Sequence, residues 1–214
     1  EYEYKGKYQG VFPIKCNQHR HVVEELISCG KSWHFGLEAG SKAELLIALS
    51  LITDPKAFLI CNGYKDSHYI ETAILARQIG TRPVVVVEQA DEVDRIINAS
   101  IDIGAAPLIG IRAKLSSQSS GKWRSSIGEK AKFGLSIPEI LEAVEKLKKA
   151  RLLKDLQLMH FHLGSQINDI AILKDALQEA GQIYVELCRL GAPMGQLDVG
   201  GGLGVDYDGS QTPS

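Results

Sequence analysis

The sequence of 214 residues is nearly balanced in charge, with 24 lysine and arginine residues against 26 aspartate and glutamate residues, and 44% of it is hydrophobic. A chain of this size and composition can bury a core as a globular domain. Its longest basic run is KLKK at residues 146–149, which argues against nucleic acid as a partner. No apolar stretch approaches the roughly 20 residues of a membrane span, which argues against a membrane partner.

The four cysteines, at positions 16, 29, 61 and 188, are far apart and form no C-x-x-C pair. This spacing favours free thiols in a reducing compartment. The sequence lacks an initiating methionine and stops in the turn-like YDGSQTPS. Both ends therefore indicate a fragment of a longer protein.

Short β-rich runs alternate along the chain with longer segments of helical periodicity. Strands are expected at Gln9–Ile14, Trp33–Gly36, Phe58–Cys61, Pro83–Val87, Leu108–Ala113, Leu156–His162 and Gln196–Val199. Helices are expected at Val22–Cys29, Ser41–Leu51, Asp66–Ile79, Asp91–Ile103, Ile137–Lys149 and Ile170–Leu190.

This alternation predicts an α/β fold in which helices cross a parallel sheet. About seven strand–helix units are present, one short of a (β/α)₈ TIM-type barrel. We therefore predict an incomplete barrel in one domain over residues 1–214, with an open doubly wound sheet as the alternative. A long polar segment, KLSSQSSGKWRSSIGEKAK at residues 114–132, is expected to be a functional or mobile loop.

Polar residues and glycines gather at the expected carboxyl ends of the strands, where barrel enzymes place their chemistry. They are Lys15, Glu38, Asn62, Arg112, His162 and Gly200–Gly202. This arrangement predicts a functional site at that edge of the sheet.

Lys15 follows the apolar run that contains Val11, Phe12 and Ile14. Partial desolvation there would favour a neutral, nucleophilic amine that can form a Schiff base. A surface or ion-paired lysine is the alternative.

Gly200–Gly202 follow an apolar strand in the stretch DVGGGLGVDY. Successive glycine N–H groups can turn toward one anion, and barrel phosphate sites commonly use the loops after strands seven and eight. A glycine-rich turn without a ligand is the alternative. The spacing does not match the dinucleotide pattern G-x-G-x-x-G.

The stretch MHFHLGSQ places His160 and His162 on the same face of a strand. One interpretation is a metal-binding H-x-H pair. In the other, His162 stacks on or hydrogen-bonds a planar ligand, and His160 is an interior histidine. Ser41 and Glu44 have the spacing of a helix capping box, and a functional role for Glu44 also stays open.

Six stretches occur in order along the chain: YQGVFPIKCNQ, FGLEAGSKAELL, CNGYKD, GEKAKFGL, HFHLGSQI and LDVGGGLGVDYDG. Together they resemble the biosynthetic arginine decarboxylase family of the alanine-racemase-like (fold type III) pyridoxal-phosphate enzymes. The resemblance runs from about residue 8 to residue 209.

This resemblance implies that Lys15 holds pyridoxal 5′-phosphate as a Schiff base and that His162 stacks against the cofactor ring. Ser165 and the backbone of Gly200–Gly202 would hold the phosphate. The remaining cofactor-binding positions that it implies are Glu38, which stands where the family has an aspartate, Glu44 and Arg112.

The resemblance further implies decarboxylation of L-arginine, a small-molecule amino-acid substrate, to agmatine and carbon dioxide, a step of polyamine biosynthesis. It also implies a homo-oligomer with active sites at a dimer interface, and magnesium is expected from the family alone. It adds the expectation of a cytoplasmic protein, or a plastid one if the source is a plant. Diaminopimelate or another basic amino acid is the alternative substrate, because H-x-G-S-Q also occurs in diaminopimelate decarboxylase. A pyridoxal-phosphate-binding homeostasis protein that catalyses little is a further alternative.

The family's E-P-G-R-like motif and its C-terminal β-domain are not in this sequence. We therefore expect residues 1–214 alone to be an unclosed barrel with exposed edges and little activity.

Overall fold

A computed structural model describes residues 5–115, 133–207 and 209 of the chain. The chain divides into two compact units, Glu1–Ile109 and Gly110–Ser214. Most of the polar segment expected as a loop, residues 116–132, lies outside the described residues.

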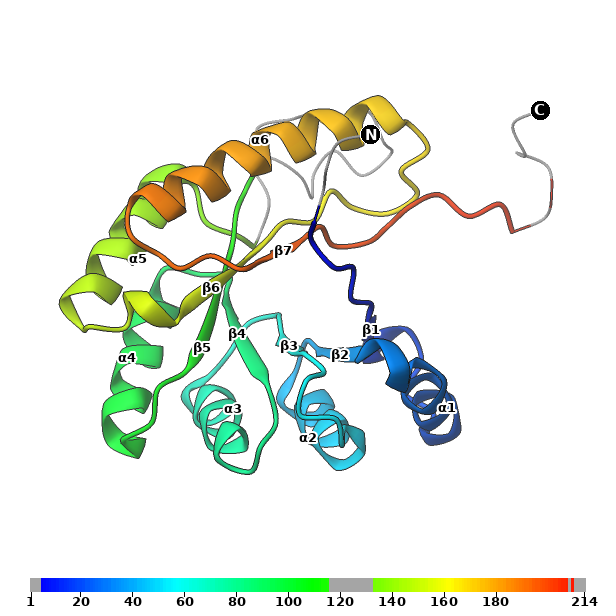
Figure 1. Cartoon of the computed structure of the whole chain (residues 1–214), viewed down its shortest axis with the longest axis horizontal. Helices are drawn as coiled ribbons and strands as arrows, with labels where there is room; N and C mark the ends of the chain where they lie inside the picture. The colour runs from blue at the N-terminus through cyan, green and yellow to red at the C-terminus, as the bar shows by residue number, and fades with distance from the viewer. Residues whose placement is uncertain (1–4, 116–132, 208, 210–214) are drawn as a thin grey trace. The chain divides into compact units, whose positions relative to one another are not determined.

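In the first unit, strands and α-helices alternate along the described chain (Figure 1). Short 3₁₀ turns, η1 and η2, lie on either side of the first helix. In chain order the elements are β1 (Val11–Pro13), η1 (Ile14–Cys16), α1 (Arg20–Gly30), η2 (Lys31–Trp33), β2 (Gly36–Ala39), α2 (Lys42–Leu51), β3 (Leu59–Cys61), α3 (Ser67–Gln78), β4 (Pro83–Val87) and α4 (Asp91–Ile103).

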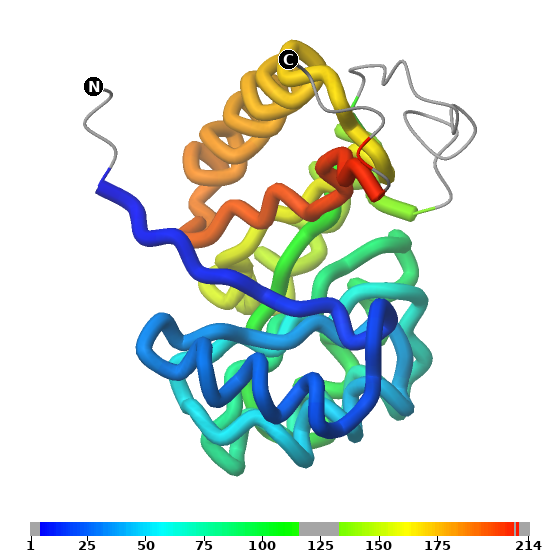
Figure 2. The backbone as a smooth tube through the Cα atoms, turned by 90° about the vertical axis from the view of Figure 1, so that its right-hand side faces the viewer, coloured from blue at the N-terminus to red at the C-terminus, as the bar shows by residue number. Residues whose placement is uncertain are grey.

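The strands β1 to β4 are parallel and pair in chain order. Their register places Pro13 beside Glu38 and Ala39 beside Cys61. Figure 2 shows the same succession of strand and helix in the blue to green part of the chain. Because parallel strands end at a common edge, the residues that follow β1 to β4 share one side of this unit.

The core of the first unit lies around β3 and β4, in which every residue is buried. The run PVVVV of β4 is apolar throughout, as expected of a parallel strand covered on both faces. Helix α4 turns Val93 and Ile96 inward at a spacing typical of one helix face. Full burial of each such side chain contributes about 1.5–3 kcal/mol.

The strand β5 (Leu108–Arg112) lies across the division between the units. The second unit continues with α5 (Ile137–Lys149), η5 (Leu153–Asp155), β6 (Leu156–His160), α6 (Ile170–Arg189) and β7 (Gln196–Asp198). Strands β6 and β7 are parallel, and His160 lies beside Asp198 in their register. Helix α5 begins at a capping box between Ser136 and Glu139.

The second strand differs from the sequence prediction. It was expected at Trp33–Gly36, but β2 begins where that range ends. Trp33 instead closes the 3₁₀ turn η2, and His34 adopts a left-handed conformation with a φ of 55°. Glu38 therefore lies within a strand and does not follow one.

Candidate functional site

Lys15 lies in the turn η1 that directly follows β1. Its Nζ is 3.9 Å from Oε1 of Glu38, and its side chain is 65% exposed while that of Glu38 is 20% exposed. The parallel register brings these two groups together, because Pro13 at the end of β1 lies beside Glu38. The partial desolvation expected for Lys15 is not observed, since its amine lies on an open surface next to a carboxylate.

Glu44 has a structural role at the start of α2. Its Oε2 accepts a hydrogen bond of 2.7 Å from the N–H of Gly40, and its own N–H donates to Oγ of Ser41 at 3.3 Å. The helix cap expected at Ser41 is therefore confirmed. The carboxylate of Glu44 also fixes the backbone that follows Glu38.

The loop after β3 is joined to the first turn of α4 by a fully buried ion pair that the sequence analysis missed. Nζ of Lys65 lies 3.1 Å from Oε2 of Glu92, and both side chains have no exposed surface. The Glu92 carboxylate also accepts hydrogen bonds from the N–H groups of Lys65 at 2.9 Å and Glu88 at 2.8 Å. Burial raises the pKa of Glu92, and Lys65 and these N–H groups oppose that rise.

His162 and the glycines form the candidate anion site of the second unit. His162 is exposed, two residues beyond the end of β6, and its Nδ1 lies 3.5 Å from the N–H of Gly201. The loop after β6 and the glycine segment run together, because Ile167 donates to the carbonyl of Gly202 at 2.8 Å and accepts from Gly204 at 3.0 Å. Figure 1 shows these two loops, in yellow and red, side by side.

The glycine turn fits a phosphate group. Gly200 and Gly202 have φ values of 67° and 92°, and a Cβ on Gly202 would overlap the carbonyl oxygen of Gly164. A Cβ on Gly201 would meet no atom within 4 Å, so there is open space on the side where a side chain would stand. A turn of this kind presents main-chain N–H groups to an anion, and one side chain in that space would block them.

Ser165 and Arg112 belong to the same unit as the glycine turn. A Cβ on Gly202 would stand 3.2 Å from Cα of Ser165, which places Ser165 beside the turn. Arg112 ends β5, and its guanidinium carbon is 6.0 Å from the ring centre of Phe133. Ala113, the next residue, donates to the carbonyl of His160 at 2.8 Å.

His160 pairs with Asp198 below the glycine turn. His160 is 4% exposed, and its Nδ1 lies 3.1 Å from Oδ2 of Asp198. A protonated imidazole at this distance would form an ion pair, but the two atoms are not aligned as a hydrogen bond. Burial opposes ionisation of Asp198, yet His160 and the N–H of Gly200 together lower its pKa. His160 is thus the interior histidine of the second interpretation.

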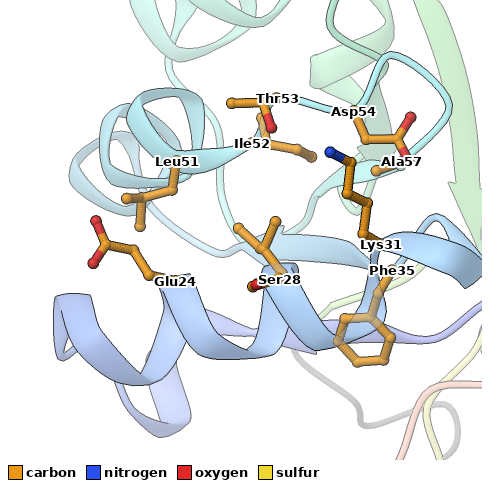
Figure 3. Close-up of a pocket in the computed structure, with 10 residues that line it drawn as sticks. Glu24, Ser28, Lys31, Phe35, Leu51, Ile52, Thr53, Asp54 and Ala57 are labelled. Carbon is orange, nitrogen blue, oxygen red and sulfur yellow. The ribbon is translucent and has the colours of Figure 1, made fainter.

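A cavity of about 250 Å³ in the first unit contains none of the predicted site residues (Figure 3). It lies between α1 and the segment that leads into β3, and its lining includes Ser28, Lys31, Phe35 and Asp54. In Figure 3 Lys31 extends toward the segment that carries Thr53 and Asp54. Strands β2 and β3 begin beside this cavity, whereas Lys15 and Glu38 lie at the carboxyl ends.

Two features are absent from the residues that the structure describes. No group of three or more His, Cys, Asp or Glu residues there could hold a metal ion. Within the same ranges, no helix has the length and apolar character needed to cross a membrane.

Comparisons with known proteins agree over nearly the whole chain. Residues 2–214 match the family described as "Pyridoxal-dependent decarboxylase, pyridoxal binding domain". The chain is 76% identical over 214 residues to the biosynthetic arginine decarboxylase of Parasynechococcus marenigrum and covers 33% of it. It is 76% identical over 212 residues to that of Prochlorococcus marinus strain SARG, again covering 33% of the relative. The chain thus spans about a third of the length of these curated relatives.

Solved structures agree with this match. The arginine decarboxylase of Campylobacter jejuni aligns with a TM-score of 0.85 at 39% identity over 95% of this chain and 33% of its own. Diaminopimelate decarboxylase from Helicobacter pylori, complexed with L-lysine, aligns with a TM-score of 0.82 at 26% identity over 99% of this chain and 52% of its own. The predicted α/β fold of an incomplete (β/α)₈ barrel is confirmed.

Proposed function

The chain belongs to the pyridoxal-binding domain family of pyridoxal-dependent decarboxylases, and from this we propose that the whole protein decarboxylates L-arginine to agmatine and carbon dioxide with pyridoxal 5′-phosphate. The proposal that arginine is the substrate rests on the 76% identity to a biosynthetic arginine decarboxylase over all 214 residues. The diaminopimelate decarboxylase of Helicobacter pylori is 26% identical, so diaminopimelate is the second candidate substrate.

Each unit of the chain carries its own group of proposed cofactor-binding residues. Lys15 supplies the amine that would hold the aldehyde group, and the carboxylate of Glu38, at 3.9 Å, would attract that amine electrostatically. The glycine turn and Ser165 would hold the phosphate, because a Cβ on Gly201 would meet no atom within 4 Å and Ser165 lies beside Gly202. When bound, the cofactor ring would draw electrons from the bond to the departing carboxylate.

The other proposed residues would help to orient the cofactor. His162 is exposed and next to Gly201, so its ring is available to stack on a planar group close to the phosphate. Glu44 holds the backbone at Gly40 and would act on the cofactor through that segment. Arg112 ends β5, at the carboxyl end where this fold places its ligands. Magnesium remains a family expectation.

The test is carbon dioxide release by the whole protein with pyridoxal phosphate, offered arginine, ornithine, lysine and diaminopimelate separately. We expect release from arginine alone and its loss by at least about a thousandfold in Lys15→Ala, because the nucleophilic amine is gone. Lys42→Ala is the matched control, since Lys42 is an exposed lysine of the same unit. Release from diaminopimelate would overturn the substrate, and full activity of Lys15→Ala would overturn the role of Lys15.

We also propose that the whole protein is a homo-oligomer that acts in the cytoplasm on a small-molecule substrate, without nucleic acid or membrane. The support is the family resemblance, in which a C-terminal domain completes the active site across a dimer. Light scattering of the purified whole protein tests this, and a monomer that is fully active would contradict it.

A further inference from the structure

The end of β7 carries a carboxylate that the proposed chemistry does not use. Asp198 is the last residue of that strand, and its two oxygens have different partners. Oδ1 accepts the N–H of Gly200 at 2.8 Å, while Oδ2 faces Nδ1 of the buried His160 at 3.1 Å. Its backbone carbonyl also accepts the N–H of Phe161 at 3.1 Å. Asp198 thus joins the strand ladder to the first residue of the glycine turn.

The bond to Gly200 determines which N–H groups remain for a ligand. The N–H of Gly200 is occupied by Asp198, so it is not a phosphate donor in this arrangement. The N–H of Gly201 instead makes a long contact of 3.5 Å with Nδ1 of His162, and a Cβ on Gly201 would meet no atom within 4 Å. This bond also holds Gly200 at a positive φ, which sets the direction in which the next N–H points.

The negative charge of Asp198 is unusual next to a proposed phosphate site. A carboxylate so close to a proposed phosphate site would repel the phosphate, and burial strengthens that repulsion. His160 is 4% exposed and faces the oxygen of Asp198 that Gly200 does not contact, so a proton on its Nδ1 would offset this charge from within the core. The carboxylate of Asp198 favours binding through the geometry of the turn, and His160 would reduce the repulsion between Asp198 and the phosphate.

We propose that Asp198 is a positioning residue that shapes the glycine turn for phosphate, and that His160 compensates its charge. This inference rests on the proposed function, because it assumes that the turn binds the phosphate of the cofactor. It assigns neither residue to the reacting atoms. Its effect is on how strongly the phosphate contributes to cofactor binding.

The experiment compares the affinity of the whole apoprotein for pyridoxal 5′-phosphate with its affinity for pyridoxal, which lacks the phosphate. In Asp198→Ala we expect affinity for pyridoxal phosphate to fall about tenfold or more, since an ordered charge-assisted bond is lost, while pyridoxal changes less than about twofold. Asp198→Asn keeps an acceptor for Gly200 and should stay within about threefold of wild type.

The role of His160 is tested by asking whether a second substitution restores cofactor binding. His160→Gln leaves the carboxylate uncompensated, so it should weaken binding of pyridoxal phosphate but not of pyridoxal, and His160→Gln with Asp198→Asn should restore it. The matched control is Asp169→Ala, which removes an exposed aspartate that accepts the N–H of Ala171 at the start of α6. That variant should leave the ratio of the two affinities unchanged.

Each outcome decides between explanations. An equal loss for both ligands in Asp198→Ala, or a loss for neither, would overturn the inference. Absence of rescue in the double variant would overturn the compensating role of His160. If the wild-type protein fails to bind pyridoxal phosphate, the proposed function itself fails, and this result is separate from any effect of the substitutions.

Discussion

Gly201 and Gly202 are neighbours in the glycine turn but differ in what surrounds them. A Cβ on Gly201 would meet no atom within 4 Å, whereas one on Gly202 would overlap the carbonyl oxygen of Gly164. Gly202 also has a φ of 92°, which an L side chain rarely adopts. Gly201 therefore has room for a side chain, and one reason for glycine at such a position is close approach of the backbone to a ligand.

We predict opposite effects of alanine at these two positions. Gly201→Ala should change the free energy of unfolding by less than about 1 kcal/mol, because its methyl group has space, and should weaken pyridoxal phosphate binding at least tenfold. Gly202→Ala should destabilise the protein by several kcal/mol through overlap and strain. Urea unfolding and cofactor titration of the whole protein measure both. Unchanged cofactor affinity in Gly201→Ala would contradict phosphate binding at the turn.

At the scale of the element, the loops after β3 and β4 depend on one buried carboxylate. Glu92 accepts the N–H groups of Lys65 and Glu88 and pairs with the Lys65 amine. Lys65 in turn donates from Nζ to the carbonyl of Gly63 at 2.5 Å. One ion pair therefore sets the path of both loops at the carboxyl edge of the first unit.

We predict that Lys65→Met lowers the free energy of unfolding by about 3–5 kcal/mol, because it leaves Glu92 buried and without its cation. Lys42→Met is the matched control, since Lys42 lies 3.8 Å from Asp66 and both side chains are about half exposed. Exposed pairs of this kind contribute about 0–1 kcal/mol. Urea unfolding of the whole protein compares the two variants, and an equal effect would show that burial of the Lys65 pair is unimportant.

The sequence was sufficient for the elements whose signal is local. The runs Pro83–Val87, Asp91–Ile103 and Ile137–Lys149 were predicted with the bounds that the structure has, because their apolar patterns are long and uninterrupted. The second strand was misplaced because Trp33 and Phe35 have strand propensity, whereas β2 is defined by its pairing with β1 and β3. Strand pairing depends on residues that are far apart in the sequence, so it leaves no signal within the strand's own sequence.

The site was predictable in part for the same reason. Lys15 and the glycines carry motifs, and the parallel register explains why Glu38 lies beside Lys15. The partners Asp198 and Glu92 were missed, since their roles depend on a contact with a distant residue. An aspartate two residues before a glycine run was the one available signal for Asp198. The roles of the predicted residues toward the cofactor remain predictions.

At the scale of the whole molecule, the chain covers 33% of relatives such as the decarboxylase of Parasynechococcus marenigrum. Large apolar side chains that follow β7 are exposed, with Leu203 at 63%, Val205 at 57% and Tyr207 at 85%. Exposed apolar groups in succession are typical of a surface that another part of a protein covers. A chain of this length could therefore bind the cofactor and still need further residues for turnover of arginine.

We predict that residues 1–214, expressed alone, release carbon dioxide from arginine at less than about one hundredth of the rate of the whole protein. Lys15 and the glycine turn are present in both, but the resemblance places further active-site groups in a C-terminal domain. Matched assays with pyridoxal phosphate at equal protein concentration measure this, with Lys15→Ala of the whole protein as the background. Comparable rates would show that these residues contain every group that the reaction needs. A rate that rises when the remaining residues are added as a separate chain would support a site completed by the rest of the protein.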